Sequence, residues 1–254
     1  MIRKFLFVLF IAGCNSDSKE TTSSKVDTSQ APTPQIKSQH LEYRRISQNE
    51  LPNSISFKGN LVAAFSWNDD LGKSIVVFSS VPEYSSPKRE MNEDEISAEL
   101  HVARYLNENN NARRTWKWEG GVLNCPFDIV SKFITGSITI TDLDKDGTAE
   151  LCFQAMESCR SDVSPSGKKL LLVENDQIYT LKGLMWLAQT PDHKMEIDEN
   201  NVNLENQPKR KEEWEEYSFR EGRYESEKEF ANAPPIFLQY ARSQWLKFVK
   251  ESFD

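Results

Sequence analysis

The feature that most constrains the fold is a succession of short β-rich runs separated by turn residues. Residues 60–80 contain two such runs joined by Asn-Asp-Asp-Leu-Gly, which suits a hairpin. Residues 169–182 contain two more around Asn175-Asp176, a two-residue turn that accepts positive φ. Strands at such short intervals predict a mainly β (α+β) fold, built as an antiparallel sheet or sandwich.

The rest of the chain adds weaker strands and one helix. A C-terminal helix is expected to begin at Pro234-Pro235, because the first turn of a helix tolerates proline. Residues 209–216 are highly charged and fit either a solvated helix or an insertion. The other strand candidates are residues 97–106 (which also allow a helix), 115–118, 127–133, 137–141 and 151–156. The apolar residues that share one face of the C-terminal helix are Phe237, Ala241, Trp245, Phe248 and Val249.

The N-terminus has the layout of a bacterial lipoprotein signal. Arg3-Lys4 precede an apolar run that is too short to span a bilayer, and the run ends in Ile-Ala-Gly followed by Cys14. We therefore expect residues 1–13 to be a signal peptide and Cys14 to receive fatty acids such as palmitate, which anchor the protein to a membrane. The alternative is an ordinary secretory signal that leaves no lipid. Asn15, where an Asp would retain the protein in the inner membrane, favours the outer membrane.

Composition divides the remainder into two parts. Residues 14–40 carry the lipidated cysteine and are otherwise rich in Ser, Thr, Lys, Gln and Pro, so they predict a disordered, flexible tether. Residues 41–254 are expected to form a single mainly β domain with a C-terminal helix. The net charge of the chain is -8, which argues against nucleic acid as a partner because phosphates need a basic surface.

Three cysteines follow Cys14, and an oxidising compartment allows two of them to pair. Cys152 lies inside an apolar run, which is typical of a buried strand, whereas Cys125 and Cys159 each lie beside turn residues. We therefore predict a Cys125–Cys159 disulfide, and the alternative is three free thiols.

One segment has the spacing of a calcium loop. The carboxylates in residues 142–150 occupy alternate positions, which directs their oxygens to one centre, and Gly147 permits the sharp turn. Ca²⁺ is therefore the predicted structural cofactor, and the alternative is an acidic turn that binds no ion. The expected ligands are Asp142, Asp144, Asp146, the carbonyl of Thr148, and Glu150.

This loop resembles the calcium loops of FG-GAP repeats, in which strands flank the loop. It is less similar to an EF-hand, because position 12 is Phe153 where an EF-hand needs Glu. Residues 141–151, together with 159–166 and the hairpin at 169–183, resemble a family of bacterial surface lipoproteins that are labelled surface polysaccharide biosynthesis proteins. The resemblance covers about residues 120–185. It implies a cell-envelope role linked to surface glycans and supplies no catalytic residues.

These observations favour a non-enzymatic envelope lipoprotein that binds a glycan or an envelope protein. The alternative is a hydrolase or transferase that acts on envelope polysaccharide. Ser166 and Lys169 match the Ser-x-x-Lys pattern of acylating enzymes, but the companion motifs are missing. Trp116 and Trp118 share one face of a strand, and they fit core packing or a sugar-stacking surface.

Overall fold

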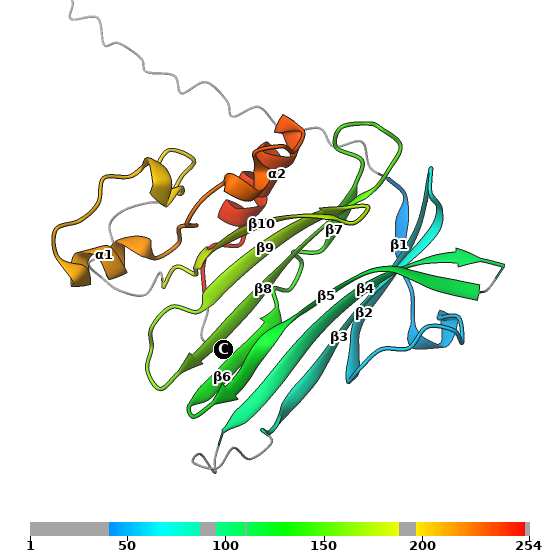
Figure 1. Cartoon of the computed structure of the whole chain (residues 1–254), viewed down its shortest axis with the longest axis horizontal. Coiled ribbons are helices and arrows are strands. Elements are labelled where there is room, and N and C mark those ends of the chain that lie inside the picture. The colour runs from blue at the N-terminus through cyan, green and yellow to red at the C-terminus, as the bar shows by residue number, and fades with distance from the viewer. Residues whose placement is uncertain (1–40, 87–94, 110, 188–196, 252–254) are drawn as a thin grey trace, which may run out of the picture. The chain divides into compact units, whose positions relative to one another are not determined.

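The computed structural model describes residues 41–86, 95–109, 111–187 and 197–251, which fold into two antiparallel sheets (Figure 1). The first sheet has the order β1 (Tyr43–Arg45), β2 (Asn60–Asp69), β3 (Gly72–Ser85), β4 (Ile96–Glu108) and β5 (Asn111–Cys125). The second sheet has the order β10 (Gln177–Leu184), β9 (Gly167–Glu174), β8 (Glu150–Arg160) and β6 (Asp128–Phe133), and β7 (Thr139–Thr141) also pairs with β8. The predicted mainly β fold with a C-terminal helix is confirmed.

The two predicted hairpins are present. Asp69 pairs with Gly72 at the β2–β3 turn, and Asn175 adopts a φ of 53° at the β9–β10 turn. Residues 97–106, which also allowed a helix, lie within β4. β5 is much longer than the predicted strand at 115–118, because the exposed basic side chains at its start hide the β pattern of this edge strand.

The two sheets pack face to face around an aromatic core. The ring of Phe153 on β8 lies edge-to-face against Phe78 of the first sheet, with the centroids 5.3 Å apart. Trp116 and Trp118 also contact Phe153, so both indoles belong to this core and not to a sugar-stacking surface. Burial of such aromatic rings contributes most of the stabilisation between the sheets.

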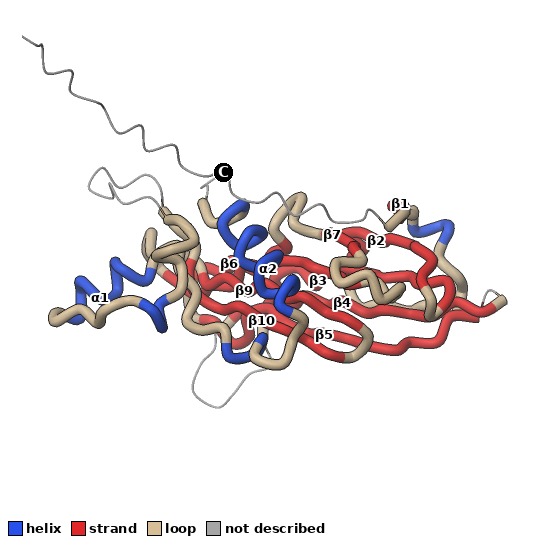
Figure 2. Tube along the Cα trace, turned by 90° about the horizontal axis from the view of Figure 1, so that it is seen from above, coloured by secondary structure: helices blue, strands red, loops and turns tan. Residues whose placement is uncertain are grey.

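The C-terminal helix α2 (Pro235–Lys247) covers the opposite face of the second sheet (Figures 1 and 2). Its predicted apolar stripe is buried at Phe237, Ala241 and Trp245. The buried Lys168 on β9 donates hydrogen bonds to the carbonyls of Trp245 and Phe248 at the end of the helix. The Lys168 side chain therefore supplies hydrogen bonds to carbonyls at the C-terminal end of the helix, and burial lowers the pKa of Lys168.

The segment at residues 46–58 covers part of the outer face of the first sheet. It contains the short helix η1 (Gln48–Glu50) and places Ile46 and Ile55 against apolar side chains of β2 and β3. The Tyr105 hydroxyl donates a hydrogen bond to the Ser56 carbonyl and so fixes this segment to β4.

The charged region before α2 contains short elements. The structure has the helix α1 (Glu213–Arg220), later in the chain than the stretch at 209–216 that fitted a helix. Ser166 is buried, and its hydroxyl donates a hydrogen bond to Glu251, which agrees with a structural role. Two short 3-10 helices complete the set, η2 (Leu204–Asn206) and η3 (Lys228–Phe230). In the described ranges, every helix is too short or too polar to cross a membrane.

The predicted disulfide is present between Cys125 and Cys159. Cys125 ends β5 of the first sheet and Cys159 lies on β8 of the second, so the bond joins the two sheets. Cys152 is a free, fully buried thiol, and burial raises its pKa to about 12.

Replacing both Cys125 and Cys159 with Ala should destabilise the fold by about 3 to 4 kcal/mol, because the bond closes a long loop of the unfolded chain. The bonded residues are 34 positions apart. Urea unfolding of the variant and the parent measures the difference. Peptide mapping under non-reducing conditions is the control, and three thiols open to alkylation in the unfolded parent would contradict the pairing.

Candidate metal centre

The acidic loop connects two adjacent strands of the second sheet. β7 pairs with β8, and the last register pair joins Thr141 to Glu150 on either side of the loop. The flanks are therefore strands, as the sequence predicted for residues 137–141 and 151–156. Lys145 and Gly147 have φ values of 65° and 88°, and these two left-handed residues turn the chain back on itself.

The three predicted aspartates converge. One carboxylate oxygen each from Asp142, Asp144 and Asp146 lies within 4.8 Å of the others. Asp144 accepts a hydrogen bond from the Asp146 N–H, and Asp146 accepts one from the Thr148 N–H. These side-chain-to-backbone bonds hold the loop in the form that brings the carboxylates together. Thr148 is buried next to them.

Glu150 follows the acidic loop as the first residue of β8. Its carboxylate is fully buried and accepts hydrogen bonds from the Leu143 N–H, at 2.9 and 3.0 Å, and from the Thr141 hydroxyl at 2.9 Å. Burial raises its pKa to about 8. Its carboxylate also lies within 4.8 Å of those of Asp144 and Glu174, so the structure places all the predicted acidic ligands in one neighbourhood.

Glu174 belongs to this site although the sequence analysis missed it. It ends β9 and lies directly opposite Glu150 in the β8–β9 register. Burial and then the charges of Asp144, Asp146 and Asp142 raise its pKa to about 7. Its position as the last residue before a turn carried no signal, because its proximity to the loop depends on the register between two strands.

The five carboxylates form a strongly negative site. Burial and the charge of Asp146 also raise the pKa of Asp144. Two oxygens, Oδ1 of Asp142 and Oε1 of Glu174, are buried and have no hydrogen-bond partner. Buried oxygens of this kind call for a proton, a water molecule or a cation. A hard divalent cation satisfies them best, since one ion would offset several charges at once.

The loop also contacts the β2–β3 hairpin of the first sheet. The Asp70 N–H donates to the Gly147 carbonyl at 2.9 Å, and the Ala149 N–H donates to Asp69 at 3.3 Å. A Cβ atom at Gly147 would lie 2.3 Å from a carboxylate oxygen of Asp70, so only glycine fits this contact without movement. The candidate metal centre therefore lies at a joint between the two sheets.

Asp69 is the residue on which this joint depends. Its fully buried carboxylate accepts hydrogen bonds from the Trp67 indole and from the Arg104 guanidinium, both at 2.8 Å, in addition to the Ala149 N–H. Arg104 is also almost completely buried, so the two charges form an ion pair inside the protein. Such a pair becomes costly when one partner is lost.

Comparisons with protein-family models, with curated proteins and with solved structures found no match.

Asp69→Ala should lower the free energy of unfolding by about 3 to 5 kcal/mol, because it leaves the buried Arg104 without its carboxylate. The neighbouring Asp70 is exposed, so Asp70→Ala is the matched control and should change stability by about 0.5 kcal/mol or less. Urea denaturation of both variants measures this. Equal losses in the two variants would show that the Asp69 carboxylate does not hold the joint.

Proposed function

We propose that this protein is a non-enzymatic, lipid-anchored component of the cell envelope, and that Ca²⁺ stabilises it as a binding or assembly module linked to surface polysaccharide. The observation that carries the calcium part of the proposal is the presence of two groups of converging carboxylates at a joint between the sheets. One group is Asp142, Asp144 and Asp146, and the other is Asp144, Glu150 and Glu174. The anchor part depends on the N-terminal sequence.

Ca²⁺ fits the donor set better than other common ions. The site offers carboxylate oxygens from several positions, and calcium takes six to eight oxygens in flexible geometry. Histidine and cysteine, which zinc and copper favour, are absent from the described groups of candidate ligands. An ion here would act structurally, because the same loop is bonded to the β2–β3 hairpin of the other sheet.

The alternative function, a hydrolase or transferase that acts on envelope polysaccharide, draws on the same carboxylates. Acid–base catalysis uses groups with a pKa near the working pH, and Glu174 has a pKa of about 7. However, the carboxylate of Glu150, its partner across the strands, is fully buried and bonded to Leu143 and Thr141. Because Glu150 cannot reach a substrate in this position, the cation proposal accounts better for the pair.

The proposed anchor is Cys14, which lies outside the described residues together with the tether at 14–40. With residues 1–13 removed, lipid on Cys14 would attach the β domain to the outer membrane through that tether. The Cys125–Cys159 disulfide supports export, since such bonds persist in oxidising compartments outside the cytoplasm.

Millimolar Ca²⁺ should raise the melting temperature of the protein, and EDTA should reverse the increase. At 100 times its dissociation constant the ion should stabilise the fold by about 2.7 kcal/mol. Asp144→Asn should remove most of this effect, because Asp144 belongs to both groups of converging carboxylates. Asp176→Asn, in the exposed β9–β10 turn, is the matched control and should keep it. A melting temperature indifferent to both Ca²⁺ and EDTA would refute the site.

Cys14→Ser should abolish lipid attachment, so that the protein either keeps its signal peptide or leaves the membrane fraction. Intact mass and membrane fractionation measure the two outcomes. Asn15→Ser is the control next to it and should be processed normally. Unchanged mass and unchanged fractionation of the Cys14 variant would rule out the anchor.

A further inference from the structure

An open groove lies on the outer face of the first sheet, where the segment at 46–58 stops covering it. The groove has a volume of about 440 Å³, within the range of small-ligand sites. Phe57 and Lys58 line it from the covering segment, His101 and Tyr105 from β4, and Glu119 from β5. It is on the opposite face of this sheet from the aromatic core and is separate from the acidic loop.

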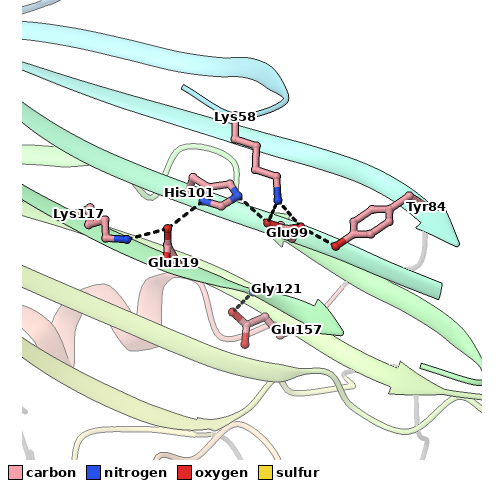
Figure 3. Close-up of polar contacts among 8 residues, drawn as sticks. All are labelled: Lys58, Tyr84, Glu99, His101, Lys117, Glu119, Gly121 and Glu157. Atoms are coloured by element: carbon pink, nitrogen blue, oxygen red, sulfur yellow. Dashed lines mark hydrogen bonds and ion pairs between the residues drawn. The ribbon is translucent and has the colours of Figure 1, made fainter. Parts of the chain in front are cut away.

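The polar side chains of the groove form one connected network (Figure 3). Glu99 accepts hydrogen bonds from Lys58 at 2.6 and 2.7 Å and from the Tyr84 hydroxyl at 2.6 Å. Its Oε2 also lies 3.0 Å from Nε2 of His101. The Lys58 ion pair holds the pKa of Glu99 below its usual range, so this carboxylate stays charged and keeps its partners in place.

Glu119 faces the other nitrogen of the same imidazole. Its Oε1 lies 3.8 Å from Nδ1 of His101 and 3.1 Å from Nζ of Lys117. In the tautomer in which Nε2 donates a hydrogen bond to Glu99, Nδ1 of His101 is an acceptor, and it faces the Glu119 carboxylate, which also only accepts. These two neighbouring acceptors suit a ligand that brings several hydrogen-bond donors.

Donors and acceptors both line this groove, and that mixture narrows the ligand class. A phosphate site would present donors alone, and a cation site would present acceptors alone. Here Lys58, Arg114 and Lys117 lie beside Glu119 and the imidazole of His101, and the half-buried ring of Phe57 is next to them. A hydroxyl both donates and accepts, while the C–H faces of a sugar ring pack on aromatic surfaces.

We propose that this groove binds a short glycan of one or two sugar units, with His101 and Glu119 accepting from its hydroxyl groups and Lys117 donating to them. The inference deepens the proposed binding function and depends on it. β5 is held in place beside the groove because Glu157 of the second sheet accepts a hydrogen bond from the Gly121 N–H at 3.0 Å.

The test is a glycan array of neutral, amino and acidic mono- and disaccharides, probed with the full-length protein in detergent. Inorganic phosphate serves as a probe that is not a sugar. At least one sugar should bind, and both His101→Ala and Glu119→Ala should weaken its affinity by at least about tenfold, the size of a lost charged hydrogen bond. Glu108→Ala, at an exposed position at the end of β4, is the matched control and should bind normally. Unchanged melting temperatures of the variants show that their folds are intact.

Absence of binding to every sugar, or binding that both groove variants retain, would overturn the proposal. Competition by phosphate at equal concentration would also overturn it, in favour of an anion site. Cleavage or transfer of a bound sugar that His101→Ala abolishes would support the glycan site but refute the non-enzymatic role. The response to Ca²⁺ is measured separately, so failure of the groove leaves the calcium proposal standing.

Discussion

Strand β8 is buried on both of its faces, between the first sheet and the layer under α2. Residues Glu150 to Met156 are all buried, because Phe153 and Leu151 face the first sheet while Cys152 faces the layer under α2. A strand in this position must be apolar nearly throughout, unlike one with a face in water. The polar residues that remain in it therefore need partners, and the side-chain amide of Gln154 donates a hydrogen bond to the Gln244 carbonyl. β8 is thus the strand on which both the core and the candidate metal centre are built.

The two ends of β8 are the points where the sheets are joined by more than apolar contact. At its beginning the acidic loop is bonded to the β2–β3 hairpin through Asp69, and near its end Cys159 is bonded to Cys125 of β5. The aromatic core between these points resists separation of the sheets but does not by itself set their register. Directional bonds do so, since a hydrogen bond or disulfide fixes particular atoms. A cation bound to the acidic loop at this joint, as proposed, would stabilise both sheets together.

Much of this arrangement follows from local sequence, and the rest requires the assembled fold. Turn residues at Asn175 and the alternation of apolar residues identify the hairpins, and the aspartate spacing identifies the loop. The sequence also favoured the Cys125–Cys159 pairing, which the structure contains. The sequence could not identify Glu174 as part of the site, nor the ion pair of Asp69 with Arg104, because strand register and sheet packing create those contacts. The sequence did not predict the groove either, since its residues come from the 46–58 segment, β4 and β5, which are far apart in the chain.

Formation of the disulfide and binding of the proposed calcium ion would both be favoured outside the cytoplasm, in agreement with the export signal proposed for the N-terminus. A disulfide needs an oxidising environment, and calcium sites of low rigidity are filled where the ion is abundant, which is the case outside cells. Both joints between the sheets would therefore be weak in the cytoplasm and strong after export. Burial first, and then the negative charges of the loop, raise the pKa of Glu174, and a bound cation would offset both effects. Export of a chain whose two sheets are not yet joined by the disulfide and the cation is consistent with the lipoprotein signal proposed for residues 1–13 and Cys14. Oxidation and cation binding would then follow outside the cytoplasm.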